Sequence, residues 1–231
     1  MIKGWIRTTL IDYPGQIASV VFLGGCSFRC PMCHNTELVL HPHTLPEIPS
    51  ETVLEYLQAR KGKITGLVVS GGEPCLSPDL PGFLREVRAL DIRIKLDTNG
   101  YFPQVLKELL RENLVDMVAM DIKAPPKKYA QLAGMKSIDL DRIQTSIALI
   151  RESGLLYEFR TTVIRDWLTV EDIAVIADWL AGIECYVLQQ FRPQGCLDPA
   201  MNHLAPYSVQ VLQEMQVIAS RKIACVQLRG V

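Results

Sequence analysis

Residues 19–35 read SVVFLGGCSFRCPMCHN, an apolar run followed at once by a loop that carries three cysteines. The run Ser19–Leu23 is rich in β-branched and aromatic residues and does not alternate with polar ones. That pattern is typical of a strand buried on both faces of a parallel sheet. The chain therefore places reactive side chains directly after a buried strand, and the same order recurs further along.

Five more apolar runs and six stretches of helical periodicity follow in alternation. Strands are expected at 66–70, 92–97, 117–121, 157–163 and 186–190, and helices at about 51–60, 79–90, 103–112, 139–152, 170–180 and 206–220. Ser50, Asp79 and Thr169 are candidate N-caps. Six β-then-α units predict an α/β fold with a parallel sheet. A full eight-unit barrel usually needs about 250 residues. A partial (βα)6 TIM-like barrel is therefore expected, with a doubly wound sheet as the alternative.

Composition bounds the class of protein. The chain has 231 residues, of which 48% are hydrophobic and 21% charged, as in globular proteins. No internal linker is visible, so we expect a single domain over residues 1–231. A net charge of −1 gives no electrostatic footprint for nucleic acid. No apolar run approaches the length of a membrane span, and Met1–Gly15 lacks the apolar core of a signal peptide. A cytoplasmic location is expected.

Chemical motifs follow the other expected strands as well. They are SGGEP at Ser70–Pro74, DTNG at Asp97–Gly100, DIK at Asp121–Lys123 and QQFRPQG at Gln189–Gly195. Ligands bind at the carboxyl ends of parallel strands, so these motifs are expected to meet at one rim. Taken singly, GGE is an ordinary strand-to-helix turn, DTNG an Asx turn and DIK a surface ion pair.

The three clustered cysteines predict metal or redox chemistry, because disulfides are unusual in a reducing compartment. Soft thiolates favour an iron–sulfur cluster or zinc. Three protein ligands would leave one iron of a four-iron cluster open to substrate. A structural zinc closed by His34 is the alternative, but His34 directly follows Cys33, whereas zinc ligands are usually spaced in pairs. Unligated cysteines are a third alternative.

Four further cysteines are scattered along the chain. Cys75, Cys185 and Cys225 are interpreted as small core residues, because a free cysteine packs as a hydrophobe. Cys196 is left open, since it lies in a loop on the expected rim. The four do not form a second cluster motif.

The cysteine triplet resembles the signature of the radical S-adenosylmethionine enzymes, and the later motifs match that family in order over nearly the whole chain. The resemblance implies a [4Fe–4S] cluster on Cys26, Cys30 and Cys33, with S-adenosylmethionine chelating the open iron. Met32 stands where the family usually places an aromatic residue against adenine. A thioether can also lie against an aromatic ring.

The same resemblance assigns the glycine-rich turn to the cofactor. It implies that Gly71, Gly72 and Glu73 bind the methionine amino group of S-adenosylmethionine. The glycines would allow close backbone approach, and a carboxylate accepts hydrogen bonds from an ammonium.

DTNG and DIK resemble motifs of the glycyl-radical-enzyme activating enzymes. The resemblance implies that Asp97, Thr98 and Asp121 hold a monovalent cation, for which oxygen ligands are suited. It also implies that Lys123 and Asn99 contact S-adenosylmethionine.

The last motif is the least specific. Arg192 stands near a position where the pyruvate formate-lyase activating enzyme has a histidine that touches S-adenosylmethionine. A ligand contact and a surface arginine are both open for it. Gln189 and Gln190 are weaker candidates to face the pocket.

The segment LIDYPGQIASVVFLGGCSFRCPMCHN, Leu10–Asn35, resembles the activating proteins of anaerobic ribonucleotide reductase. The resemblance implies reductive cleavage of S-adenosylmethionine to a 5′-deoxyadenosyl radical, which takes a Cα hydrogen from a glycine of a partner enzyme. No side chain acts as a general base, and flavodoxin or ferredoxin is the implied electron donor. Two alternatives stay open. One is a radical enzyme acting on another glycyl radical enzyme, a small molecule or a nucleotide; the other is a non-enzymatic metal-binding module.

Overall fold

The computed structural model describes residues 1–231 and contains one eight-stranded sheet in which the strands lie in chain order. The strands are β1 (Ile2–Thr9), β2 (Ala18–Leu23), β3 (Gly66–Gly71), β4 (Arg93–Thr98), β5 (Met117–Asp121), β6 (Leu156–Val163), β7 (Cys185–Gln190) and β8 (Cys225–Arg229). β1 pairs with β2 antiparallel, and every later pair is parallel. The carboxyl ends of β2 to β8 therefore meet at one edge of the sheet.

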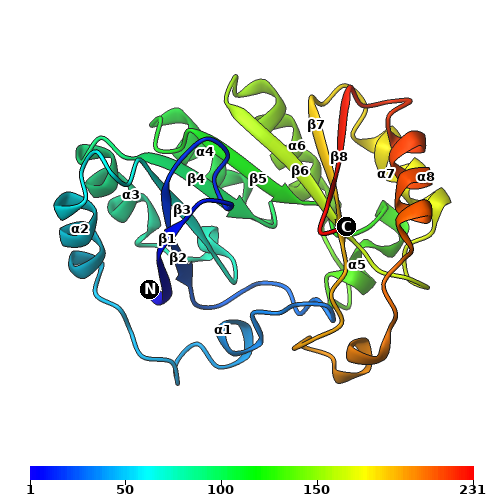
Figure 1. Ribbon diagram of the computed structural model, residues 1–231, viewed down its shortest axis with the longest axis horizontal. Coiled ribbons are helices and arrows are strands. Elements are labelled where there is room, and N and C mark those ends of the chain that lie inside the picture. The colour runs from blue at the N-terminus through cyan, green and yellow to red at the C-terminus, as the bar shows by residue number, and fades with distance from the viewer.

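Helices connect the strands and lie on the convex side of the curved sheet (Figure 1). The longer helices are α2 (Ser50–Ala59), α3 (Leu80–Ala89), α4 (Pro103–Arg111), α6 (Leu140–Glu152), α7 (Val170–Trp179) and α8 (Val209–Ala219). Short turns of helix complete the chain: α1 (Thr36–Leu40), α5 (Tyr129–Leu132), and 3-10 turns at Pro74–Leu76, Pro126–Lys128 and Pro199–His203. No helix has the length and apolar content that crossing a membrane requires.

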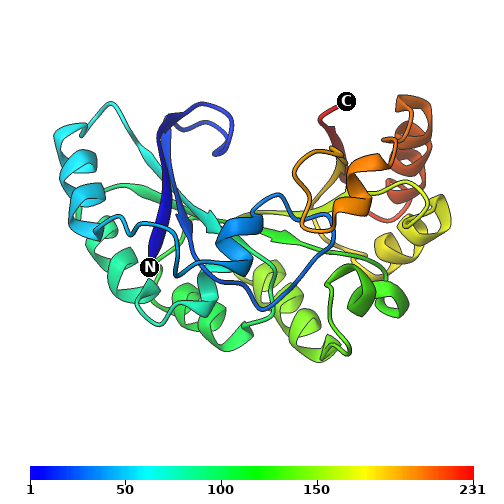
Figure 2. The same cartoon turned by 90° about the horizontal axis from the view of Figure 1, so that it is seen from below.

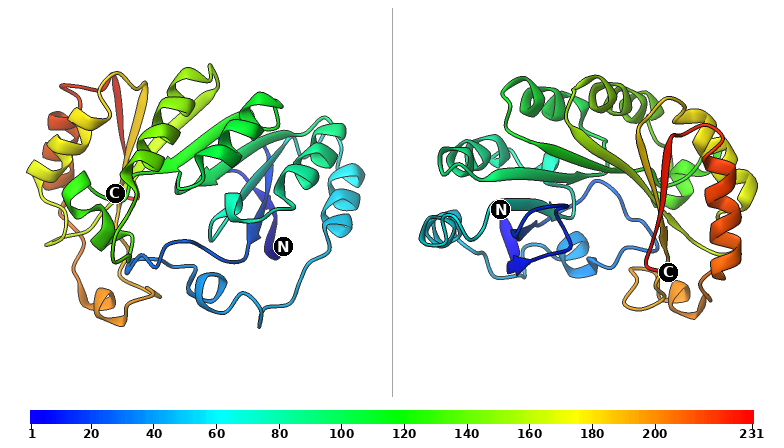
Figure 3. Two further views of the ribbon diagram at one scale, coloured as in Figure 1. Left: turned by 180° about the vertical axis from the view of Figure 1, so that it is seen from behind. Right: turned by 45° about the horizontal axis from the view of Figure 1, so that its top comes forward.

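The sheet and its outer helices form an open arc, seen along its opening in Figure 2. β1 and β8 lie at the two ends of the arc, and α1 with the loop before it lies in the hollow between them (Figures 2 and 3). The prediction of a partial barrel with parallel strands is confirmed. The doubly wound alternative is wrong, because the long helices all cover the same, outer face.

The six predicted strands correspond to β2 to β7, but β1 and β8 were not predicted. Both are edge strands of the sheet. β1 has a burial pattern that leaves its middle exposed, and β8 alternates exposed with buried residues. Neither carries the continuous apolar run that marks a strand covered on both faces, which is the signal used to find the others.

The predicted helices are α2, α3, α4, α6, α7 and α8. Thr169 caps α7 in a reciprocal capping box with Asp172, as its sequence position predicted. Asp79 stands at the N-cap of α3 without a side-chain bond, and Ser50 is the first helical residue of α2, not its cap. α8 begins later than predicted because Ser208 caps it, its hydroxyl accepting from the Val211 amide.

A continuous core joins the sheet to its helices. One cluster of 52 buried apolar residues extends from β1 to β8, so the loops at the strand ends stand on a closely packed frame. Cys30 and Met32 of the cysteine loop belong to this cluster. The loop that carries the cysteines is therefore anchored in the core at its middle.

Candidate functional site

A cavity of about 520 Å³ opens at the carboxyl ends of the parallel strands. Its lining comes from the hairpin between β1 and β2, the cysteine loop, α1 and the ends of β3 to β7. The lining residues are Asp12, Cys26, Phe28, Cys30, Met32, Cys33, His34, Asn35, Val39, Ser70, Gly71, Gly72, Asp97, Thr98, Asn99, Asp121, Lys123, Arg160, Thr162 and Gln189. The predicted convergence of the motifs on one rim is confirmed.

The cysteine loop is held in place by backbone hydrogen bonds to distant segments. The Glu73 amide donates to Gly25 O (2.8 Å), and the Arg29 amide donates to Ala133 O (2.9 Å). Two further bonds come from the loop after β7, where the Leu197 and Asp198 amides donate to the carbonyls of Cys33 (2.8 Å) and Pro31 (2.9 Å), respectively. Because three distant segments fix its backbone, the loop presents its thiols from a preorganised position.

The three thiols differ in exposure but line the same cavity. Cys30 is buried, and Cys26 and Cys33 are half-buried. Burial raises the pKa of Cys26 to about 12 and that of Cys30 to about 11. The Phe28 amide, which donates to Cys26 Sγ at 3.3 Å, acts in the opposite direction. Without a bound metal ion, Cys26 and Cys30 stay protonated at neutral pH. A metal ion would reverse this balance by binding the thiolate.

The donor set fits an iron–sulfur cluster better than a single zinc ion. No group of three or more His, Cys, Asp or Glu side chains is arranged around one ion position. His34 Nε2 is engaged with the carbonyl oxygen of Arg192 at 2.8 Å, so this nitrogen is not free to close a zinc site. Three thiols on one wall of a larger cavity match the ligands that a multi-iron cluster requires.

The turn after β3 brings bare backbone against the cysteine loop. Asn35 Nδ2 donates to Gly71 O at 2.6 Å, which ties the CHN segment to this turn. A Cβ placed on Gly72 would lie 1.9 Å from Gly25 O. Gly71 has φ = 123°, a backbone conformation that side chains rarely adopt, and a Cβ there would meet Leu23 backbone atoms at 2.4 Å. Glycine is therefore required at both positions, and both line the cavity.

Glu73 does not line the cavity, contrary to the expectation that its carboxylate binds the cofactor. It is 1% exposed, and its carboxylate accepts from the Asn99 amide (2.7 Å), the Thr98 hydroxyl (2.8 Å) and the Cys75 amide (3.0 Å). Burial raises its pKa, and these three donors oppose the rise. In this structure Glu73 ties the end of β3 to the end of β4 and so positions Asn99.

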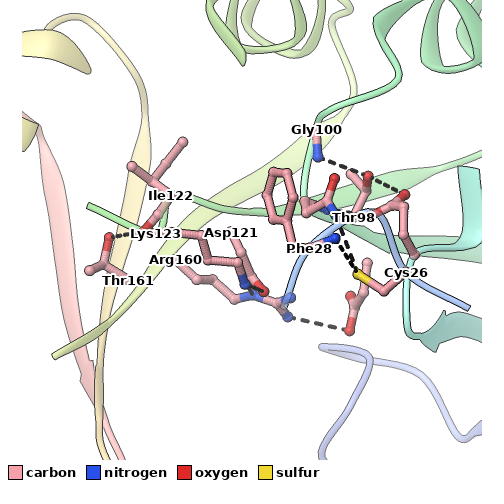
Figure 4. A network of polar contacts seen from close by, with 12 residues as sticks. Cys26, Phe28, Thr98, Gly100, Asp121, Ile122, Lys123, Arg160 and Thr161 are labelled. Atoms are coloured by element: carbon pink, nitrogen blue, oxygen red, sulfur yellow. Dashed lines mark hydrogen bonds and ion pairs between the residues drawn. The ribbon is translucent and has the colours of Figure 1, made fainter. Parts of the chain in front are cut away.

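Across the cavity from the cysteine loop lies a network of charged side chains centred on Arg160 (Figure 4). Arg160 Nε lies 2.8 Å from Asp121 Oδ1, and its Nη1 lies 3.4 Å from Asp97 Oδ2. The remaining oxygens of the two carboxylates face lysines: Lys123 Nζ lies 2.8 Å from Asp121 Oδ2, and Lys95 Nζ lies 2.7 Å from Asp97 Oδ1.

This network keeps its members charged. Burial alone would raise the pKa of Asp121, but Arg160 and Lys123 outweigh it and hold the pKa below its usual range. Burial would likewise lower the pKa of Lys123, but Asp121 outweighs it, and the net direction is upward. The cavity lining thus contains two cationic groups, the Lys123 ammonium, which acts on Cys30, and the Arg160 guanidinium.

The arrangement does not fit the monovalent cation that the sequence suggested. Each of the four oxygens of Asp97 and Asp121 already faces an ammonium or guanidinium nitrogen. The Thr98 hydroxyl donates to Glu73. Arg160 thus occupies the position between the two carboxylates.

Arg192 is exposed and is not part of the cavity lining, so its side chain does not take the expected ligand-contacting position. Its carbonyl oxygen accepts from the His34 ring. Gln189 lines the cavity as suggested, whereas Gln190 turns away and donates to Tyr207 O at 2.7 Å. Cys196 is buried beside His34, with its Sγ 3.9 Å from His34 Nε2.

Two charged residues of the cavity, Asp12 and Arg160, were not predicted from the sequence. Arg160 lies inside the predicted strand 157–163, where Glu158, Arg160 and Thr162 alternate with less polar residues. A period of two places these three side chains on one face of the strand, and that alternation was the available signal. Asp12 lies in the LIDYPG segment, ahead of the first predicted strand, and carried no comparable signal.

Known proteins resemble this chain in sequence and in fold. The family sequence model of the radical SAM superfamily matches residues 20–180 of this chain. A Methanocaldococcus jannaschii protein named "Putative glycyl-radical enzyme activating enzyme" is 31% identical over 239 residues, covering 100% of this chain and 96% of that protein. The pyruvate formate-lyase-activating enzyme of Clostridium pasteurianum is 34% identical over 132 residues, covering 53% of this chain and 54% of that enzyme.

Solved structures of much lower sequence identity share the fold of this chain. The crystal structure of Streptococcus suis SuiB bound to S-adenosylmethionine has a TM-score of 0.68 at 15% identity. It covers 91% of this chain and 52% of SuiB, so this chain spans about half the length of that protein. At this identity the likeness is one of fold.

The matched range of residues 20–180 holds the cysteine loop, the glycine turn and most of the charged network, and it covers more than half of the chain. The protein is an iron–sulfur enzyme of the α/β class whose cavity faces the carboxyl ends of its strands. The chain belongs to the radical SAM superfamily, whose members use a [4Fe–4S] cluster and S-adenosylmethionine.

Proposed function

We propose that this enzyme activates a glycyl radical enzyme, with anaerobic ribonucleotide reductase as its partner. The observation that carries the proposal is the match over 100% of the chain to a relative named for glycyl-radical-enzyme activation. The resemblance of Leu10–Asn35 to the activating proteins of ribonucleotide reductase supports the choice of partner.

Cys26, Cys30 and Cys33 are the proposed ligands of the cluster, since all three line the cavity on one preorganised loop. A [4Fe–4S] cluster held there beside S-adenosylmethionine would supply one-electron reductive cleavage, and so a radical able to take a hydrogen atom from the Cα of a glycine. Because the step is homolytic, the protein contributes position rather than a base.

The residues around the thiols provide a binding place for a zwitterionic cofactor. Gly71 and Gly72 allow the backbone of the turn to approach a ligand, and Met32 offers a buried thioether to an aromatic ring. Three cations of the charged network, Lys95, Lys123 and Arg160, stand against two carboxylates. Lys123 and Arg160 line the cavity, and cationic side chains there suit a ligand carboxylate.

An exposed apolar segment beside the cavity supports a protein substrate rather than a small molecule. Leu10 is 73% and Ile11 89% exposed, and both directly precede Asp12 of the cavity lining. Apolar side chains exposed together are typical of an interaction site. In Figure 2 this hairpin tip projects beside the open side of the arc. We propose that it contacts the partner that presents the glycine.

The test of this proposal separates docking from chemistry. In a Leu10→Ser, Ile11→Ser double variant, glycyl radical formation on anaerobic ribonucleotide reductase at sub-saturating partner should fall about tenfold, as for loss of a small hot spot. 5′-Deoxyadenosine release without the partner should be unchanged. Val217→Ser is the matched control, because Val217 is also exposed but belongs to α8, which lies on the convex side of the sheet. Equal radical yields in the double variant and the control would contradict the docking role.

We also propose an electron donor, a cellular location and a domain organisation for this enzyme. One electron per turnover is required, and we propose that flavodoxin or ferredoxin delivers it to the cluster in the cytoplasm. A single sheet with one main core cluster supports one domain over residues 1–231.

A further inference from the structure

Two cysteines outside the cavity are paired across the last two strands of the sheet. Cys185 is the first residue of β7, Cys225 is the first residue of β8, and the two are direct register partners. Figure 1 shows β7 and β8 side by side at one end of the arc. The sequence interpretation of both as small core residues is wrong for Cys225, which is exposed, while Cys185 is half-buried.

The two side chains share one face of the sheet, since direct partners in a parallel pair point the same way. Cys185, Val187 and Gln189 alternate along β7 onto one face, and Gln189 lines the cavity. The cysteines therefore point to the concave side, at the end of the strands opposite to the cavity. Both are free thiols in this structure.

The spacing suits a covalent link. Neighbouring strands lie about 4.7–4.9 Å apart, and disulfides join Cα atoms about 4.4–6.8 Å apart. The register pairing of Cys185 with Cys225 therefore places their Cα atoms within the range that a disulfide spans. The exposure of Cys225 gives an oxidant access to one member of the pair.

We propose that Cys185 and Cys225 form a dithiol–disulfide pair that fastens β8 to β7 when it is oxidised. The oxidant is a low-molecular-weight disulfide. The Cys225 thiolate attacks one sulfur of that disulfide and releases one thiolate; the Cys185 thiolate then attacks Cys225 Sγ and releases the second. The protein loses two protons and two electrons, and the small disulfide is reduced to two thiols.

The strand that would be fastened carries a contact to the charged network. At its other end, Arg229 forms a bidentate ion pair with Glu158, with nitrogen–oxygen distances of 3.0 and 2.9 Å. Glu158 in turn lies 3.8 Å from Arg160 Nη1. β8 is an edge strand whose one neighbouring strand is β7, so a covalent link to β7 restricts its opening.

The experiment uses the cluster-loaded protein under anaerobic conditions, with oxidised glutathione as the probe. Free thiols are alkylated, and chymotryptic peptides are analysed by mass spectrometry; the aromatic residues between Cys185 and Cys196 allow the two to be separated. A Cys185–Cys225 linked peptide, removed by dithiothreitol, is the expected product. Amide exchange of β8 should slow about tenfold on oxidation, because local opening becomes rarer.

Two variants control the test. Cys185→Ser should stop at a mixed disulfide of glutathione with Cys225, and Cys225→Ser should form no link and show no slowing of exchange. Because Cys225 is exposed, its replacement leaves the core intact. Recovery of wild-type Cys225 as a persistent glutathione adduct, or of both residues alkylated separately, would overturn the proposal.

Discussion

The close approach of the glycine turn to the cysteine loop makes Gly72 the sharpest test of the site's construction. In Gly72→Ala the new methyl group would lie 1.9 Å from Gly25 O and 2.7 Å from Gly25 C. Ordinary C···O contacts are about 3.3 Å, so the loop and the turn must separate by more than about 1 Å. The clashing atoms belong to the backbone of Gly25, so no side-chain rotation can remove the clash.

The cost follows from the contacts that such a shift breaks. The Gly72 amide donates to Leu23 O (2.9 Å) and the Glu73 amide to Gly25 O (2.8 Å). Two backbone hydrogen bonds at about 1 kcal/mol each, with about 1–3 kcal/mol for overpacking, give about 3–5 kcal/mol. For a chain of this size each kcal/mol lowers Tm by about 2–4 °C, so a fall of about 10 °C is expected.

Thermal unfolding of the cluster-free protein measures this cost, and iron content after reconstitution measures the effect on the loop, which should hold less iron than in wild type. Gly82→Ala is the matched control, because a Cβ at Gly82 in α3 meets nothing within 4 Å. That variant should gain about 0.5–1 kcal/mol from helix propensity. A Gly72→Ala protein with wild-type Tm and full iron loading would refute the reasoning.

Three further changes have definite expected outcomes. Cys30→Ala should bind no intact cluster yet unfold cooperatively near the wild-type Tm, checked by absorbance and circular dichroism; loss of the fold would indicate a structural metal instead. Arg160→Met should cost about 3 kcal/mol, measured by urea unfolding, because two buried carboxylates lose their shared partner; an unchanged unfolding midpoint would show that the network does not need it. Asp172→Asn should cost about 1 kcal/mol at pH 7. Burial would raise the pKa of Asp172, but Lys128 and the Thr169 amide outweigh it, so its contribution is present above about pH 4 and lost as the pH falls through the lowered pKa. The variant's stability should therefore depend less on pH between about 5 and 3, and an unchanged dependence would contradict this.

Much of the fold was predictable because most of its strands are covered on both faces. Runs such as Ser19–Leu23 could be read directly, and the helices between them followed from periodicity. The edge strands β1 and β8 escaped because an exposed face removes the continuous apolar run. The start of α8 was misplaced because a cap at Ser208, rather than the periodicity, decides where that helix begins.

In the site, backbone positions were predicted better than side-chain orientations. Residues whose backbone shapes the cavity, such as Gly71 and Gly72, lie where the motifs placed them. Side-chain orientation was less predictable: Glu73 is adjacent to these glycines yet points into a buried cluster of donors. The sequence predicted a monovalent cation between Asp97 and Asp121. Arg160 lies there instead, because β6 projects its side chain toward both carboxylates. The position of Arg160 depends on how β4, β5 and β6 pack together, and a local sequence motif does not contain that information.

Electron paramagnetic resonance of the partner tests the central claim most directly. The cluster-loaded enzyme, dithionite and S-adenosylmethionine are incubated anaerobically with anaerobic ribonucleotide reductase, and 5′-deoxyadenosine is measured in the same sample. The account predicts a glycyl radical signal on the reductase, matched by 5′-deoxyadenosine and absent when Cys30→Ala replaces the enzyme. Release of 5′-deoxyadenosine with no radical on the reductase would contradict the proposed partner.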